Sequence, residues 1–193
     1  MELTLDKNIR NVIFDFGGVL VDWNPRHLFK DYFKTEEEME YFLKNICTDE
    51  WNSRQDAGRS LAEGTALLQN QFPEFAEPIG MYYGQWDKMI GGEISENVEL
   101  LKKLKSQGYK LYGLTNWSCE TLPRVRNRYD FFKLFDGIVV SGEEHIVKPD
   151  PRIYQILLDR YKLVPEECVF LDDSARNVEA ARKMGISAIQ VVR

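Results

Sequence analysis

The chain has 193 residues, a length that suits one compact domain carrying a smaller insertion better than two full domains. Hydrophobic residues make up 44% and aromatic residues 12%, which is enough for a real core and excludes a disordered chain. The formal net charge of −6 argues against a nucleic-acid partner, which normally requires a basic surface. A small anionic substrate remains compatible with this charge, because a few local cations can hold it.

The opening stretch MELTLDKNIR lacks the basic-then-apolar pattern of a signal peptide, and no run approaches the ~18 apolar residues of a membrane span. We therefore expect a soluble, cytoplasmic protein without a membrane partner. Cys47, Cys119 and Cys168 are widely spaced and form no CxxC pair, which argues against a zinc site. We expect them to be reduced thiols in or near the core. The sequence does not indicate an oligomeric state.

Five short apolar runs rich in β-branched and aromatic residues predict buried strands. They span residues 11–16, 110–116, 137–141, 168–173 and 187–192. Helical patterns alternate with the later runs, at residues 97–108, 151–162 and 175–185, where Gly185 is expected as the C-cap. Alternating strands and helices predict an α/β fold, a Rossmann-like parallel sheet with helices on both faces.

The alternation breaks once, over about 75 residues after the first strand, where no convincing strand is found. Capping boxes at Thr35/Glu38 and Ser60/Glu63, followed by the aromatic segment MYYGQWDKMI, predict an insertion of four or five helices. We expect a helical cap at residues 22–92 and an α/β core at residues 1–21 and 93–193. Since ligands of open α/β sheets bind at the carboxyl ends of the strands, an insertion that leaves from such an end can cover the site.

Polar residues end three of the predicted strands. Asp15 ends the first, Thr115 and Asn116 end the second, and the pair Asp172-Asp173 ends the fourth. Lys148 lies in KPDP, just before a helix that Pro151 helps to start. Parallel strands bring these ends together, so we expect carboxylates that suit Mg²⁺ beside a lysine and a hydroxyl that suit phosphate.

With these four motifs in order, DFGGV, LTN, KPDP and FLDD, the sequence resembles the haloacid dehalogenase-like hydrolase superfamily over the whole chain. The resemblance implies an enzyme with a Rossmann-like core, a helical cap inserted after the first motif, and a phosphatase reaction that uses Mg²⁺. It implies further that a small phosphorylated metabolite, such as a sugar phosphate, is the substrate.

The resemblance also implies a role for each matching residue. Asp15 would be the nucleophile that forms an aspartyl-phosphate, Lys148 would neutralise it and the phosphate, and Thr115 with Asn116 would hydrogen-bond the phosphoryl group. Mg²⁺ would be held by Asp15, Asp173 and the Gly17 carbonyl, with Asp172 as a further ligand or an acceptor beside them. Asn177 would hold a metal-bound water.

The sequence departs from the superfamily pattern at Gly17. Phosphatases of this superfamily usually carry a second Asp there, which protonates the leaving oxygen and later deprotonates water; such help is typically worth ~10²–10⁴-fold. Three alternatives follow: a phosphatase for an easily displaced leaving group, a metal-independent 2-haloacid dehalogenase, or a module that binds a phosphorylated ligand without turnover. The Asp172-Asp173 pair favours the first. Asp22 is one candidate for the missing carboxylate.

Each chemical interpretation has a structural competitor. Asp172 and Asp173 could be a helix cap before SARNVEAA, and His145 is more readily a loop residue than an acid. Aromatic residues of the insertion are more often core than pocket, but they could form a wall suited to a sugar face. The substrate-pocket candidates are Trp23, Asn24, Trp51, Arg54, Tyr83, Trp86 and Trp117, with Arg54 the best candidate for a second anionic group.

Overall fold

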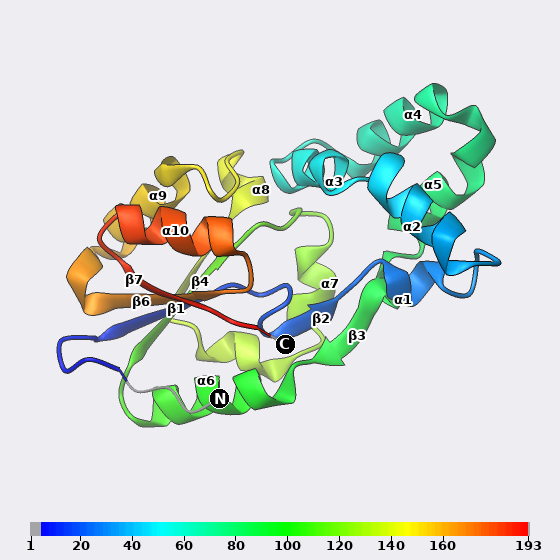
Figure 1. Cartoon of the computed structure of the whole chain (residues 1–193). Coiled ribbons are helices and arrows are strands. Elements are labelled where there is room, and N and C mark those ends of the chain that lie inside the picture. Colours follow the sequence, from blue (N-terminus) through cyan, green and yellow to red (C-terminus); the bar gives the residue numbers. More distant parts are fainter. Residues whose placement is uncertain (1–4, 193) are drawn as a thin grey trace.

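The computed structural model describes residues 5–192, and a five-stranded parallel sheet forms its centre (Figure 1). The sheet order is β5-β4-β1-β6-β7. All five predicted strands are confirmed, and each ends one or two residues earlier than predicted, because the following residues turn into loops at the carboxyl edge. The strands are β1 (Asn11–Phe14), β4 (Lys110–Thr115), β5 (Gly137–Val140), β6 (Cys168–Asp172) and β7 (Ser187–Gln190).

β1 lies in the middle of this sheet, paired with β4 on one side and β6 on the other. Its side chains alternate between two cores: Val12 and Phe14 pack on one face and Ile13 on the other. Helix α6 (Ser95–Ser106) covers the first face, and helices α9 (Pro151–Tyr161) and α10 (Ala175–Lys183) cover the second (Figure 1). Burial on both faces explains why β1 reads as a continuous apolar run.

The three predicted core helices are therefore confirmed. α9 starts with Pro151 in its first turn, and the Asp150 side chain caps it by accepting from the Arg152 N–H at 2.9 Å. α10 ends at Lys183 with Met184 as its C-cap, so Gly185, the predicted C-cap, lies one position beyond the observed cap, with φ +82°. Short helices complete the core: α7 (Leu122–Arg126), α8 (Ser141–Glu144) and 3₁₀ turns at Asp130–Leu134 and Pro165–Glu167.

The prediction of no strand between residues 17 and 96 is wrong. β2 (Val21–Trp23) and β3 (Ile90–Glu93) form an antiparallel pair that leads out of the core and back into it (Figure 1). β2 has three residues, and β3 contains Gly91 and Gly92, which are disfavoured in strands. Neither segment shows a strand pattern alone; each needs its distant partner.

Between β2 and β3 the chain is helical, which confirms the predicted run of helices. This helical insert contains α1 (Arg26–Phe29), α2 (Glu36–Asn45), α3 (Asp49–Asp56), α4 (Leu61–Gln71), α5 (Ala76–Gly84) and 3₁₀ turns at Pro73–Phe75 and Trp86–Met89. Thr35 and Glu38 form the complete capping box of α2. At α4 the structure shows the Ser60 half of the box, in which Ser60 accepts from the Glu63 N–H at 3.2 Å.

The helical insert contacts the core through the end of α3 and the start of α4. The Ser141 hydroxyl donates to the Asp56 carbonyl at 2.6 Å, and His145 Nδ1 lies 3.2 Å from the Ala57 carbonyl. Leu61 N–H donates to the Glu120 carboxylate at 2.8 Å. These contacts hold the last turn of α3 against the loops at the carboxyl edge of the sheet.

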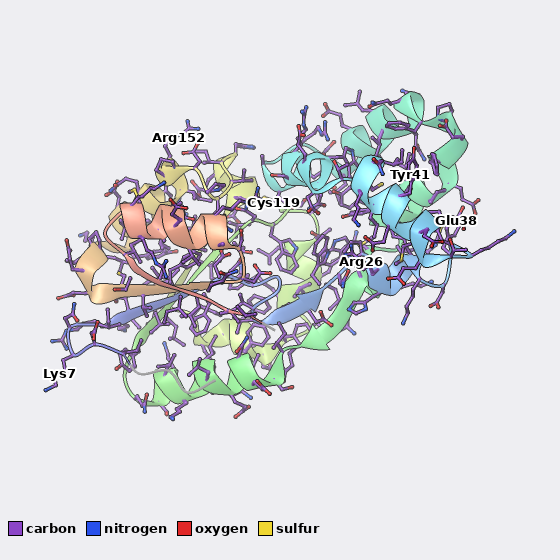
Figure 2. All side chains as sticks on the ribbon, in the orientation of Figure 1. Lys7, Arg26, Glu38, Tyr41, Cys119 and Arg152 are labelled. Atoms are coloured by element: carbon purple, nitrogen blue, oxygen red, sulfur yellow. The ribbon has the colours of Figure 1, made fainter. Side chains whose placement is uncertain are left out.

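No helix described for residues 5–192 is both long and apolar enough to cross a membrane; part of the N-terminal stretch, residues 1–4, lies outside the described residues. Cys47 and Cys168 are buried free thiols, as expected. The expectation for Cys119 is wrong: it is exposed, because it lies in the loop that leaves β4 toward the surface (Figure 2).

Candidate active site

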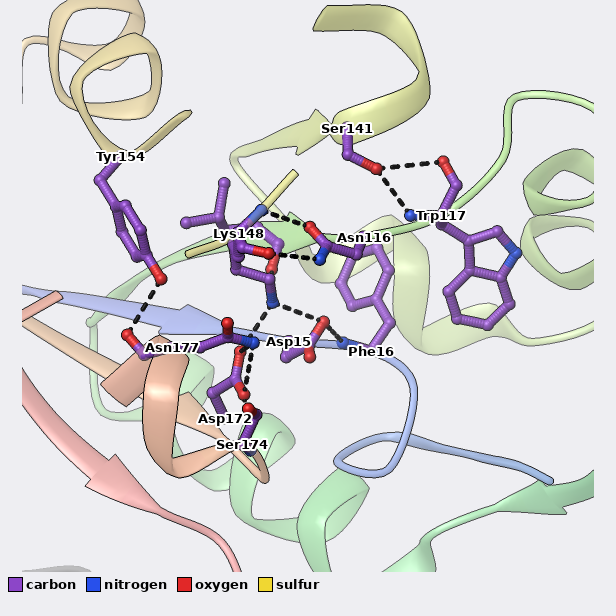
Figure 3. Close-up of polar contacts among 11 residues, drawn as sticks. Asp15, Phe16, Asn116, Trp117, Ser141, Lys148, Tyr154, Asp172, Ser174 and Asn177 are labelled. Atoms are coloured by element: carbon purple, nitrogen blue, oxygen red, sulfur yellow. Dashed lines mark hydrogen bonds and ion pairs between the residues drawn. The ribbon is translucent and has the colours of Figure 1, made fainter. Parts of the chain in front are cut away.

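The polar residues at the strand ends converge on the ammonium group of Lys148 (Figure 3). Its Nζ lies 3.0 Å from Asp15 Oδ1 and 2.7 Å from Asp172 Oδ2, and it donates to the Leu114 carbonyl at 2.8 Å. The Lys148 side chain is completely buried. A buried ammonium with two carboxylates and a carbonyl has its charge and its hydrogen bonds satisfied.

Asn116 holds the loop that carries Lys148. Its side-chain amide donates to the Lys148 carbonyl at 3.0 Å and accepts from the Lys148 N–H at 2.8 Å. This pair of bonds joins the end of β4 to the loop before α9 across 32 residues of sequence. The Asn116 side chain thus positions the lysine, while its contact with a phosphoryl group stays a prediction.

Asp172 is surrounded by donors. Besides Lys148, Oδ1 accepts from the Ser174 N–H at 2.8 Å, and the Asn177 amide lies 3.1 Å from both carboxylate oxygens. Asn177 is fixed in turn, since its carbonyl accepts from the Tyr154 hydroxyl at 2.9 Å. Asp172 therefore orients the lysine and the start of α10.

The charges of this cluster depend strongly on burial. Burial raises the pKa of Asp15 to about 8; the nearby Lys148 ammonium opposes this rise, and the Asp172 and Asp173 carboxylates add to it. Burial alone would lower the pKa of Lys148, but the Asp15 and Asp172 charges outweigh it and raise that pKa. Further positive charge beside Asp15 would return it to the carboxylate form at neutral pH.

A cation fits at this place. Asp15, Asp172 and Asp173 each offer a carboxylate oxygen, and these oxygens lie within 4.8 Å of one another. Gly18 lets Asp173 approach the backbone, because a Cβ at Gly18 would lie 2.1 Å from Asp173 Oδ2 and because Gly18 has φ +74°. Carboxylate oxygens at this spacing suit a hard divalent ion such as Mg²⁺.

Two buried polar atoms beside the cluster lack a hydrogen-bond partner within residues 5–192, namely Thr115 Oγ1 and Asn177 Oδ1. Thr115 is fully buried at the end of β4 and follows Leu114, which accepts from Lys148. Unpaired buried polar atoms are costly, so such atoms point to a ligand or a water. Thr115 and Asn177, both sequence candidates, thus have unused acceptor capacity in the site.

A cavity of about 60 Å³ lies beside Gly17, between the core and the helical insert. Four of the aromatic candidates from the sequence contribute to its lining: Trp23, Tyr83, Trp86 and Trp117. The Trp117 ring packs edge-on against Trp86 at 5.9 Å and donates to the Thr121 hydroxyl at 3.0 Å. The structure thus gives the cavity an aromatic wall.

The structure does not bring the other candidates of the insert to this cavity. Arg54 lies on the exposed side of α3, where it pairs with Glu50 at 3.1 Å. Trp51 packs within the insert and donates to the Gly64 carbonyl at 3.1 Å. Asp22 and Asn24 line a separate hollow with Gly18 and Asp173, and Asp22 lies 3.0 Å from His27 Nε2.

Sequence reasoning missed four polar residues of the cavity: Ser118 and Thr121 of the core, and Asn52 and Asp56 of the insert. Asn52 and Asp56 lie on α3, where Asn52 donates to Asp56 Oδ2 at 2.9 Å. The segment DEWNSRQD has almost no apolar periodicity, so the sequence neither predicts a helix there nor indicates which of its side chains face the core. Only the Thr48 cap, which accepts from the Trp51 N–H, could have marked its start.

Comparisons with known proteins agree with the geometry. A family model described as haloacid dehalogenase-like hydrolase matches residues 9–185. A phosphorylated carbohydrates phosphatase of Thermotoga maritima is 34% identical over 185 residues, covering 92% of this chain and 82% of the relative. A sesquiterpene phosphatase of Aspergillus oryzae is 27% identical over 179 residues, covering 93% and 88%. The structure of a family enzyme from Bacteroides thetaiotaomicron, in complex with magnesium and inorganic phosphate, has a TM-score of 0.69 at 23% identity and covers 94% of this chain and 93% of that one.

Proposed function

Because the chain belongs to the haloacid dehalogenase-like hydrolases, we propose that it is a Mg²⁺-dependent phosphohydrolase that acts through an aspartyl-phosphate at Asp15. The observation that carries this proposal is the contact of Lys148 with Asp15 and Asp172, beside the carboxylate of Asp173. A carboxylate nucleophile next to a fixed cation and a cation site is the arrangement that phosphoryl transfer requires.

Asp15 Oδ1 accepts from Lys148 and from the Phe16 N–H at 2.7 Å. These two donors fix the orientation of the carboxylate before substrate arrives, which lowers the entropic cost of the attack. Lys148 also offsets the negative charge that accumulates when a phosphate approaches three carboxylates.

Asp15, Asp173 and the Gly17 carbonyl would hold Mg²⁺, which when bound supplies positive charge to the carboxylates and the phosphoryl oxygens. Asp172 is better suited to the supporting role, because both of its oxygens already accept hydrogen bonds. The unpaired Thr115 hydroxyl would bind a phosphoryl oxygen, and the unpaired Asn177 oxygen would accept from a metal-bound water.

We propose residues 22–92 as the cap of this site and a small phosphorylated metabolite as the substrate. The aromatic cavity beside Gly17 supports a compact organic group rather than a polymer. Similarity to the phosphatase of Thermotoga maritima supports a phosphorylated carbohydrate among small metabolites, since an aromatic wall also suits the apolar face of a sugar ring.

A panel of phosphate esters tests the proposal. Glucose 1-phosphate, glucose 6-phosphate, fructose 1-phosphate, AMP, acetyl phosphate and 4-nitrophenyl phosphate are incubated with the protein, with Mg²⁺ or with EDTA, and phosphate release is measured. We expect release that needs Mg²⁺ and that disappears in Asp15→Asn. The matched control is Asp130→Asn, because the Asp130 side chain is 91% exposed and forms a surface ion pair with Lys133.

Other outcomes identify the alternatives. Phosphate release that survives EDTA or the Asp15→Asn change contradicts the mechanism. Halide release from 2-chloropropionate without metal would instead identify a dehalogenase. Thermal stabilisation by a phosphate ester with no turnover of any of them would identify a binding module.

A further inference from the structure

The cavity beside Gly17 holds a carboxyl group for which neither the sequence motifs nor the metal site gives a role. Asp56 is the only acidic residue among the described residues that line this cavity. Asp56 comes from α3 of the insert. Gly17 and Asn116, which also line the cavity, belong to the core: Gly17 follows the nucleophile Asp15 by two residues, and Asn116 directly follows Thr115. Asp56 therefore lies on the same cavity as the loops that follow β1 and β4, next to Asp15 and Thr115 in the sequence.

Asp56 is held in place from both sides. Asn52, one helical turn earlier, donates to Asp56 Oδ2 at 2.9 Å, and Asn52 itself accepts from the Tyr83 hydroxyl at 2.8 Å. From the core, the Ser118 N–H donates to the carboxyl and the Ser141 hydroxyl donates to the Asp56 carbonyl at 2.6 Å. These bonds fix the carboxyl against the loop that follows β4.

The environment of Asp56 suits proton transfer. Burial raises its pKa to about 7, and the Ser118 N–H opposes this rise. The nearby phenols of Tyr82 and Tyr83 have pKa values raised by burial and stay neutral. Asp56 can therefore hold or release a proton near neutral pH, which is the requirement for a group that acts as an acid in one step and as a base in the next.

We propose that Asp56 is the general acid and base of this enzyme, reaching the substrate from the insert and replacing the carboxyl that is absent at Gly17. This assignment rests on the function proposed above. Asp22, the candidate from the sequence, lies in a different hollow and contacts His27.

The two steps balance with Asp56 in this role. In the first, Asp15 attacks phosphorus, the bond from phosphorus to the leaving oxygen breaks, and protonated Asp56 gives its proton to that oxygen, which leaves as an alcohol. In the second, water attacks the aspartyl-phosphate, ionised Asp56 takes a proton from the water, and the bond from phosphorus to Asp15 breaks. Inorganic phosphate leaves, and both carboxyl groups return to their first state.

The test compares leaving groups that need a proton with one that does not. Asp56→Asn should lower kcat/KM for the best sugar phosphate of the panel by ~10²–10⁴-fold. For 4-nitrophenyl phosphate, whose phenolate leaves without a proton at pH 8, kcat/KM should change little. The kcat for 4-nitrophenyl phosphate should fall, because hydrolysis of the aspartyl-phosphate lacks its base. A burst of one nitrophenolate per active site should therefore appear before the slow steady state.

Asp49→Asn is the matched control, since Asp49 is an exposed carboxylate on the same helix, and it should retain both activities. Gly17→Asp in the Asp56→Asn protein should restore part of the sugar-phosphate activity, because the nearest atom to a Cβ at Gly17 is Trp117 Cζ3 at 3.8 Å. Equal losses for both kinds of ester, or no loss for the sugar phosphate, would overturn the role of Asp56 while leaving the proposed function standing. A wild-type protein that hydrolyses neither ester would overturn the proposed function and this assignment with it.

Discussion

The raised pKa of Asp56 predicts a dependence of stability on pH that can be measured without any substrate. In the unfolded chain its carboxyl titrates near 3.8, and in the folded protein near 7. The folded state therefore binds more protons between these values. The sign follows: stability from protonated Asp56 is fully present below about pH 4 and is lost as pH rises through about 7.

The size of this loss follows from the two pKa values. Integrated between pH 5 and pH 8.5, a shift from 3.8 to about 7 corresponds to about 2.7 kcal/mol of free energy of unfolding. Asp56 is only partly buried, so solvent screens some of this cost, and about 2 kcal/mol is expected. For a chain of 193 residues this is a difference of about 4–8 °C in melting temperature.

The assay compares urea unfolding of the wild-type protein and of Asp56→Asn at pH 5, 6, 7 and 8.5 in EDTA. Other titrating groups, including Asp15, are present in both proteins and cancel in the difference. The variant should gain about 2 kcal/mol relative to the wild type over this range. A difference that stays flat with pH, or that has the opposite sign, would refute the reasoning. Asp49→Asn should show a flat difference.

Three further predictions concern the site. Lys148→Met should destabilise the protein by about 3–5 kcal/mol, because it leaves buried carboxylate charge without its cation. Lys110→Met, at an exposed lysine, should cost under about 1 kcal/mol. Equal losses of the two variants in urea unfolding would contradict this expectation. Gly18→Ala should lower the free energy of unfolding by about 1–2 kcal/mol, because Gly18 has φ +74°, and it should weaken Mg²⁺ binding, because the new Cβ would meet the Asp173 carboxylate. Gly17→Ala should leave the melting temperature almost unchanged. Apparent Mg²⁺ affinity, measured by calorimetry, should rise by up to about tenfold per pH unit below pH 8, because Mg²⁺ must displace the proton of Asp15; affinity independent of pH would exclude this coupling.

The sequence predicts the core of the site because its parts follow from strand order. Asp15, Thr115 and Asp172 each end or directly follow a parallel strand, and such strands share one carboxyl edge wherever they occur in the chain. Lys148 could be added because Pro151 marks the start of the next helix. Each of these signals is local in the sequence, and the parallel order of the strands is enough to bring the residues together at one edge of the sheet.

Asp56 could not be predicted in the same way. Its environment is made by Ser118, Trp117 and Gly17, which lie far away in the sequence, and by a helix without an apolar stripe. Nothing in DEWNSRQD distinguishes its last carboxyl from the exposed Asp49 at its start. The two carboxyls differ only because the insert docks on the core, which partly buries Asp56 and leaves Asp49 exposed.

The separation of Asp56 from the metal site has a chemical consequence. A second carboxyl at the position of Gly17 would join Asp15, Asp172 and Asp173, so its proton affinity would depend on bound metal and phosphate. Burial is the main cause that raises the pKa of Asp56, and the Ser118 N–H opposes it. Since Ser141 and His145 contact the end of α3 from the core, the proposed proton donor keeps its place only while the insert lies on the core. Proton transfer and exclusion of water from the aspartyl-phosphate would then depend on the same contact.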